Sequence, residues 1–103
     1  MNMRLNQYKV NGKAPANLEE IASKYLRNRR NDRTIIKHAL CCKNYSGIIE
    51  YGQLLKESGK TFGFDLVTKT GETLVRLAAE RKDEGIVSLM EEYSKSLNNI
   101  NQE

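Results

Sequence analysis

The chain has 103 residues, of which 39% are hydrophobic and 29% are charged, and its formal net charge is +4. A chain of this length forms one domain with a modest core, and its composition is typical of globular proteins and excludes collagen-like and low-complexity classes. No apolar stretch approaches the roughly 20 residues of a membrane helix and the N-terminus lacks a signal-peptide core, so we expect a cytoplasmic protein, or one delivered into a host cytoplasm.

Positive charge is concentrated in the first part of the chain. Residues 1–43 contain ten Lys or Arg and three Asp or Glu, a net charge of +7, whereas residues 44–103 contain seven against ten, a net charge of −3. We therefore expect a molecule with a basic end and a mildly acidic end.

The helical domain is expected to span residues 17–97, after a partly ordered arm over residues 1–16. Asn17 and Glu20 have the spacing of a capping box, and an apolar stripe follows them to about Asn28. A connection over residues 27–33 then leads to a second helix, 33–43, which Asp32 is expected to cap.

A third helix is expected from Ser46 to a C-cap at Gly59. Gly52 inside this helix costs about 1 kcal/mol relative to Ala, which indicates a close approach by another helix. In residues 60–69 the alternation of Phe62 and Phe64 with polar residues predicts a short extended finger.

Two helices with a tight connection are expected at the end of the chain. Thr73 is a candidate N-cap, with Gly71 in the turn before it. The connection over residues 82–85 is short enough to require an antiparallel hairpin. The two apolar stripes consist of Leu74, Leu77 and Ala78, and of Ile86, Val87, Leu89, Met90, Tyr93 and Leu97. Residues 98–103 are expected to be a frayed polar tail.

This last pair of helices resembles an ankyrin repeat. The family pattern G-x-T-P-L-H-x-A-A-x-x-G-x-x-x-I-V-x-L-L is matched without a gap at Gly71, Thr73, Leu74 or Val75, Ala78, Ala79, Ile86, Val87, Leu89 and Met90. The Pro, His and inter-helix Gly of the family are replaced by Leu74, Arg76 and Lys82. A second copy aligns Thr34 with Thr73, at a spacing of 39 residues against about 33 in the family, so the resemblance covers residues 32–93.

The resemblance implies an all-α protein of about five helices, a capping helix followed by two stacked antiparallel helical hairpins in a short ankyrin-like solenoid. It also implies a non-catalytic interaction module, an adaptor or inhibitor that binds a protein partner through a concave face. The partner-binding residues to which it points, with the finger phenylalanines as aromatic anchors, are Arg33, Cys42, Phe62, Phe64, Lys69, Glu72, Glu80 and Arg81. Ordinary packing under the loop is the alternative for both phenylalanines. Because two repeats give little core, a homodimer, or a larger partner that completes the stack, is a further expectation.

Catalytic and metal sites have little support in the sequence. His38, the single histidine, lies on the same helical face as Cys42, but no third group or oxyanion site accompanies them. A disulfide between the adjacent Cys41 and Cys42 would be strained and would close almost no loop, so free thiols are expected. We therefore expect no enzymatic activity, no metal and no cofactor.

The alternative function is a small nucleic-acid-binding regulator that uses the basic segment 24–37. The residues that would contact phosphates are Lys24, Arg27, Arg29, Arg30, Arg33 and Lys37. The segment loosely resembles the opening of a helix-turn-helix motif, but its expected connection is longer than three to four residues and lacks a Gly. A solvated basic face is the competing interpretation.

Overall fold

A computed structural model describes residues 14–101, and side chains are described for residues 18–100. The elements in chain order are α2 (Ala14–Asn28), the 3-10 turn η1 (Arg29–Asn31), α3 (Asp32–Cys41), α4 (Tyr45–Phe62), α5 (Asp65–Ala79) and α6 (Asp83–Asn101). The all-helical prediction is confirmed, since residues 14–101 contain no strand. The expected arm lies outside the described residues up to residue 13, and α2 begins at Ala14, so Asn17 lies inside the helix and is not its N-cap.

One continuous rod is formed by α2, η1 and α3. Asn28 and Asp32, which flank η1, both have right-handed helical backbone angles. The connection predicted over residues 27–33 is therefore wrong, and the described chain forms four helical rods rather than five separate helices. Asn31 occupies the N-cap position of α3 without a side-chain cap hydrogen bond, and Asp32 lies buried in the core instead of capping the helix.

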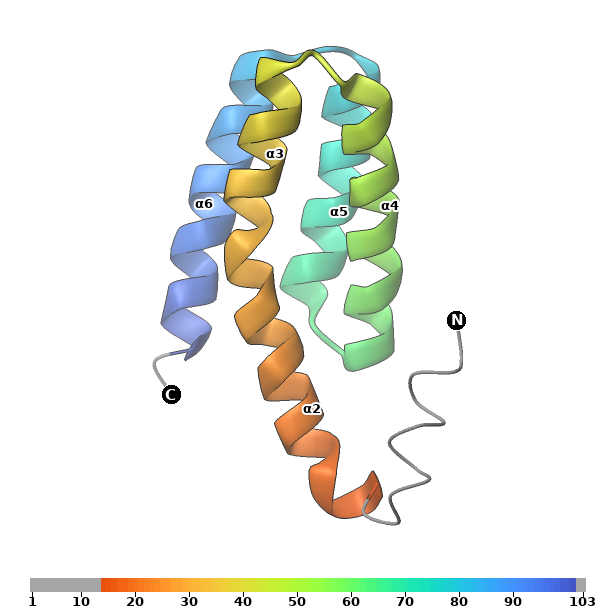
Figure 1. Ribbon diagram of the computed structural model, residues 1–103, viewed down its shortest axis with the longest axis vertical. Helices are drawn as coiled ribbons and strands as arrows, with labels where there is room; N and C mark the ends of the chain where they lie inside the picture. The colour runs from red at the N-terminus through yellow and green to blue at the C-terminus, as the bar shows by residue number, and fades with distance from the viewer. Residues whose placement is uncertain (1–13, 102–103) are drawn as a thin grey trace.

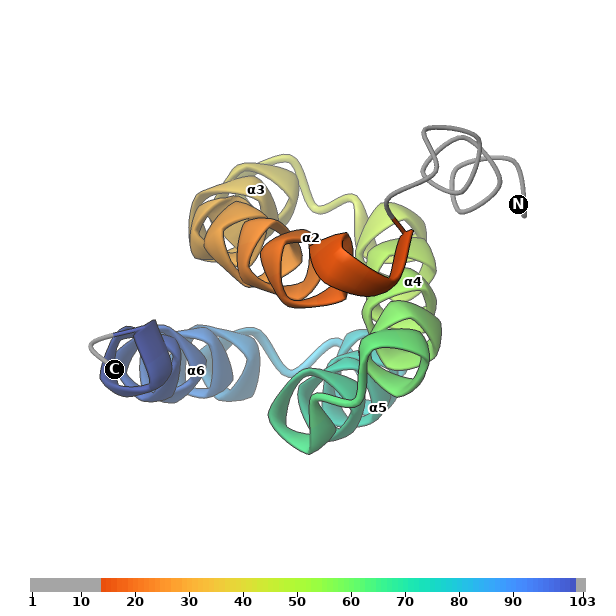
Figure 2. The same cartoon turned by 90° about the horizontal axis from the view of Figure 1, so that it is seen from below.

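The four rods run alternately up and down around one core (Figure 1). Viewed along their axes, they occupy four corners, so α3 borders α4 and α6 and lies diagonally across from α5 (Figure 2). The first part of α2 extends past the ends of the other helices (Figure 1).

The core between the rods contains the apolar residues that the two final stripes predict. Both stripes are confirmed as buried faces, the first by Leu74, Leu77 and Ala78 and the second by Ile86, Met90, Tyr93 and Leu97. Ile36 of α3, Ile48 and Leu55 of α4, and Val67 of α5 complete the centre. Val87, by contrast, is 46% exposed.

The pair α4 and α5 packs more closely than any other pair of helices. A Cβ atom on Gly71 would lie 2.6 Å from the backbone nitrogen of Lys56 and would also collide with the carbonyl oxygen of Gly52. A Cβ atom on Gly52 would lie 3.0 Å from the carbonyl oxygen of Gly71. The close approach predicted at Gly52 is confirmed, whereas Gly71 is a packing residue inside α5 and not part of a turn.

Several predicted helix ends are wrong because the glycines that suggested them lie where two helices make close contact. Gly59 does not end α4 but packs against α5, since a Cβ atom on Gly59 would lie 2.6 Å from the backbone nitrogen of Thr68. The helix continues to Phe62 and ends at Gly63, whose φ of 79° is left-handed. The extended finger therefore does not form, and α5 begins at Asp65 with Thr73 in its interior.

The connection between the last two helices is also shorter than predicted. It consists of residues 80–82, and α6 then runs from Asp83 to Asn101, through the first part of the expected frayed tail. The predicted antiparallel hairpin is confirmed, since α5 and α6 run in opposite directions side by side (Figures 1 and 2).

Candidate functional site: the groove between α3 and α6

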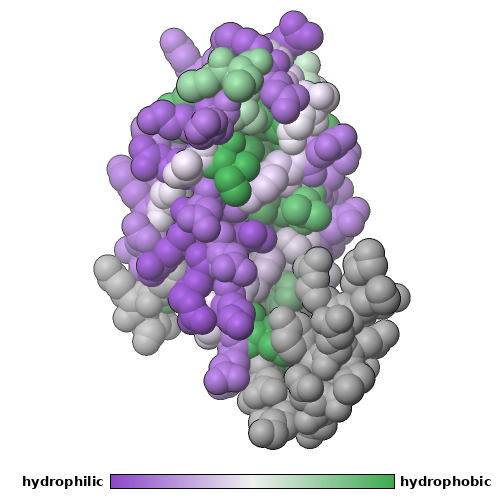
Figure 3. Space-filling model, in the orientation of Figure 1, coloured by the Kyte–Doolittle hydropathy of each residue, from purple (hydrophilic) through white to green (hydrophobic). Residues whose placement is uncertain are grey.

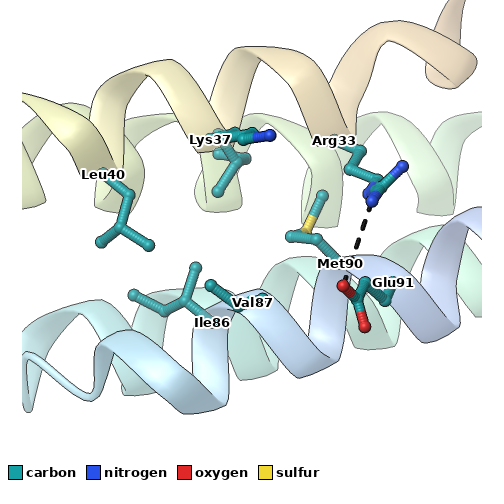
Figure 4. Close-up of a pocket in the computed structure, with 8 residues that line it drawn as sticks. Arg33, Lys37, Leu40, Ile86, Val87, Met90 and Glu91 are labelled. Carbon is teal, nitrogen blue, oxygen red and sulfur yellow. Dashed lines mark ion pairs between the residues drawn. The ribbon is translucent and has the colours of Figure 1, made fainter.

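An apolar groove opens between α3 and α6, with a volume of about 130 Å³. Its floor is formed by Ile36, Ile86 and Met90, each at most 2% exposed. Leu40 and the half-exposed Val87 form its sides. The side chains of Leu40, Val87 and Met90 project into the space between the two helices (Figure 4). The groove therefore offers solvent-accessible apolar surface directly above the core.

The two walls of the groove carry opposite charges. Arg33 and Lys37 extend from α3, and Glu91 extends from α6 (Figure 4). The Nη2 atom of Arg33 lies 3.9 Å from Oε2 of Glu91, and both side chains are more than half exposed, so this ion pair is weak. Among the described residues, Lys37 forms no ion pair.

The basic wall continues along the middle of the rod as a basic row, defined here as Lys24, Arg27, Arg30, Arg33 and Lys37. All five residues are exposed. Their spacings of three, three, three and four residues put one basic side chain on each successive turn, over about 20 Å. The only acid within residues 21–43 is Asp32, which is buried, so no exposed carboxylate of the rod lies between Lys24 and Lys37. The other acids of the described rod, Glu19 and Glu20, are exposed, and Glu20 lies one helical turn before Lys24. Hydrophilic side chains cover much of this face, and the hydrophobic patches between them are small (Figure 3).

Arg29, the sixth candidate for phosphate contact, does not belong to the basic row. Its Nε atom lies 3.2 Å from Oδ2 of Asp32, and its guanidinium carbon lies 4.8 Å from the centroid of the Tyr25 ring. The proximity of Asp32 raises the pKa of Arg29, although burial of the guanidinium opposes this effect. Arg29 is therefore a structural residue that pairs with the buried carboxylate.

Asp32 lies at the point where the rod meets α4 and α6. The hydroxyl of Tyr93 donates a hydrogen bond to Oδ2 at 2.6 Å, and the hydroxyl of Tyr51 donates to Oδ1. Burial of Asp32 raises the pKa of its carboxyl above the usual value, against the lowering effects of the two tyrosines and Arg29. Burial also raises the pKa of Tyr93 and of Tyr51, so both hydroxyls stay protonated as donors. This cluster holds α3 beside α6, and so fixes one end of the groove.

The other end of the groove is held by the loops at the ends of α3 and α5. The carboxylate of Asp83 accepts hydrogen bonds from Lys43 Nζ at 2.7 Å and from the Tyr45 hydroxyl at 2.6 Å. These bonds lower the pKa of Asp83 and raise that of Lys43. Lys43 and Arg81 lie in the loops that follow α3 and α5 and have positive φ angles of 57° and 55°, in a position that usually favours glycine.

The partner-binding residues predicted from the resemblance are spread over the molecule. Only Arg33 lines the groove. Cys42, Glu80 and Arg81 are exposed in the loops at the Lys43–Asp83 end, and Lys69 and Glu72 are exposed on α5. The guanidinium carbon of Arg81 lies 5.2 Å from the centroid of the Tyr45 ring.

Phe62 is the last residue of α4 and Phe64 lies in the turn between α4 and α5, at the opposite end of the bundle from the Cys42 loop (Figure 1). Their rings stack on Tyr25 of α2, with centroid distances of 4.3 Å and 5.9 Å. Both side chains are half-buried, and the Tyr25 hydroxyl is 2.6 Å from Oγ of Ser58. These aromatic residues therefore attach α2 to the end of α4.

The groove itself could not be predicted from the sequence. Lys37 was a candidate only for phosphate contact, and Ile86, Val87 and Met90 were predicted to form one buried stripe. The signal that distinguishes Val87 is its position at the edge of this stripe, and its exposure depends on how far α3 lies from α6. Residues about 50 positions apart in the chain define that distance.

The described residues show no arrangement typical of a metal site or a membrane span. His38, Cys41 and Cys42 are exposed, and no group of three His, Cys, Asp or Glu within the described part could hold a metal ion. None of the helices between residues 14 and 101 combines the length and apolar character that crossing a bilayer requires.

The fold and the groove together define a small all-helical bundle with one open apolar seam. Comparison with known proteins does not narrow this class further, since no family model, curated protein or solved structure matches the chain.

Proposed function

We propose that this protein is a non-catalytic protein-recognition module that binds a segment of a partner protein in the groove between α3 and α6. The observation that carries the proposal is the solvent-accessible apolar surface of Leu40 and Val87, above the buried Met90 and between walls of opposite charge. Binding energy at protein interfaces is concentrated in a few apolar anchors that fill well-packed pockets, with a polar rim around them. The groove has this arrangement.

Two matched surface substitutions test the proposal. Val87→Glu places a charge inside the groove, and Leu54→Glu places the same charge at an exposed apolar position on α4, outside the groove. Because both side chains are about half exposed, 46% and 58%, neither substitution should unfold the protein. Circular dichroism and thermal unfolding of both variants verify this.

The measurement is a pull-down from nuclease-treated lysate with the wild type and both variants, quantified by mass spectrometry. The expected result is a partner that is retained by the wild type and by L54E and is lost with V87E. A partner set that is the same for all three proteins would contradict recognition through the groove. Self-association lost with V87E in sedimentation would identify a second copy of the chain as the partner.

An ankyrin-like solenoid is the finer proposal about architecture. It is supported by the two antiparallel pairs, α3 with α4 and α5 with α6, which correspond to the two aligned copies. It is opposed by the packing of α3 against α6, because the first helices of successive repeats stack on each other in a solenoid of hairpins, and α3 here lies diagonally across from α5 (Figure 2).

Nucleic-acid binding is the second candidate function, and the basic row is the observation that favours it. Five exposed basic side chains on successive turns, with the one acid of the segment buried, would suit a phosphate backbone. Binding of this kind would fall steeply as salt rises and would not depend on Val87. We place it second because it leaves the apolar groove without a role.

A further inference from the structure

The charges around the groove are not balanced, although its walls have opposite signs. On the α6 side, Glu91 is already paired with Arg33. On the α3 side, Lys37 has no ion pair among the described residues, and Arg30, Arg27 and Lys24 continue the basic row away from the groove without one. A bound segment would therefore meet an excess of unpaired positive charge along one side.

The size of the groove limits what can enter it. Its volume of about 130 Å³ is close to that of an engineered apolar cavity of about 150 Å³ that holds a benzene molecule. One large apolar side chain, aromatic or branched, fills such a space. Further contacts must then come from the surface beside the groove, and the basic row is the surface that continues from its α3 wall.

We propose that the occupant of the groove is an acidic segment of a partner protein, which inserts one large apolar side chain between α3 and α6 and places Asp or Glu residues against Lys37 and Arg30. This inference rests on the proposed function and specifies the chemistry of the partner. Charge complementarity of this kind steers encounter and excludes basic partners, while the apolar anchor supplies most of the affinity.

A selection from a displayed library of random 16-residue peptides tests the proposal with the full chain immobilised. Four proteins are used in parallel: the wild type, V87E, the double charge reversal R30E/K37E, and R76E. Arg76 is an exposed residue on α5, diagonally across from the rod, and provides a charge-reversal control.

On the wild type and on R76E, the enriched peptides should carry one Phe, Trp, Leu or Met with at least two Asp or Glu within four residues of it. V87E should not enrich them. R30E/K37E should bind them about tenfold more weakly, which corresponds to ~1.4 kcal/mol, and should itself enrich peptides with Lys or Arg at the same positions. A variant that was only destabilised would not change its preference from acidic peptides to basic ones.

The outcomes separate this inference from the proposed function. Peptides that depend on Val87 but show no acidic preference, or no exchange of preference with R30E/K37E, overturn the acidic partner and leave groove recognition intact. Failure to enrich any peptide that depends on Val87 overturns both. Binding of a labelled single-stranded 20-nucleotide DNA that is retained by V87E and lost with R30E/K37E would assign the basic row to nucleic acid instead.

Discussion

Asp32 is the residue on which the contact between the rod and its neighbours depends. Its carboxylate, fully buried, is reached by Tyr51 of α4 and Tyr93 of α6 and is paired with Arg29 of η1. Removing a charge from water costs free energy, so a buried carboxylate with hydrogen-bonded partners adds little to net stability. Its main effect is to favour one packing arrangement of the helices over others. Loss of a single partner would leave the charge undercompensated.

This environment predicts an unusual dependence of stability on pH. Because burial raises the pKa of folded Asp32 above the unfolded value near 3.9, the folded protein binds more protons than the unfolded chain between the two pKa values. The free energy of unfolding that Asp32 controls therefore falls as pH rises above about 4, and levels off above the folded pKa. Asp32→Asn removes this titration, so wild type should lose stability relative to D32N over that interval in urea unfolding.

Asp83→Asn is the control with the opposite sign. Lys43 and Tyr45 lower the pKa of Asp83, so its contribution is complete above about pH 4 and is lost as pH falls below that value. The wild type should therefore gain stability relative to D83N as pH rises toward 4. A difference between wild type and D32N that is constant with pH would contradict the raised pKa of Asp32.

At the scale of the helices, the α4–α5 seam predicts a steric limit at Gly71. Gly71→Ala places a methyl group against the backbone of Gly52 and Lys56, and backbone atoms cannot move aside as side-chain ends can. Overpacking of this kind costs about 3 kcal/mol, and the better helix propensity of Ala offsets about 1 kcal/mol, so we expect a net loss of about 2 kcal/mol in urea unfolding.

Gly85→Ala is the matched substitution in α6. The closest atom to its new methyl group would be Cδ2 of Leu77, at 3.2 Å, which is the flexible end of a side chain, and the next two, Cδ1 of Leu77 and Cβ of Lys82, would lie at 3.5 Å and 3.7 Å. The better helix propensity of Ala favours the variant by up to about 1 kcal/mol, so we expect G85A to be as stable as the wild type or more stable by at most about 1 kcal/mol. Equal changes in the free energy of unfolding for G71A and G85A would show that α4 and α5 lie farther apart than the close contacts at Gly71 indicate.

The same glycines explain how far the helices could be predicted from the sequence. The buried stripes follow from apolar spacing alone, and the cost of Gly52 in a helix correctly indicated close packing. In the sequence, Gly59 is indistinguishable from a C-cap glycine and Gly71 from a turn glycine, and only the neighbouring helix shows that both allow close packing. The prediction that Asp32 caps a helix is wrong for the same reason, since its partners Tyr51 and Tyr93 lie 19 and 61 residues away in the chain.

The whole bundle combines one tight helix pair with a looser seam. The glycines join α4 closely to α5, whereas α3 and α6 face each other across the groove and are connected at the Asp32 cluster and the Lys43–Asp83 pair. The spacing of residues in the sequence predicts that Arg33 and Lys37 are candidate binding residues. It does not predict the groove, because the gap between α3 and α6 depends on how all four rods pack.

This asymmetry predicts where the molecule opens first. In amide hydrogen exchange, α4 and α5 should be the most protected elements, and α3 and α6 should exchange faster by local separation. Tyr93→Phe removes the α6 donor to Asp32 at a cost of about 1–3 kcal/mol, so exchange should rise in α3 and α6 more than in α4 and α5. Ser58→Ala, which removes the contact of Ser58 with Tyr25 away from the groove, should not reproduce this pattern. A uniform rise over all four rods in Y93F would mean that the bundle opens as one cooperative unit, and that a partner must bind a groove already formed.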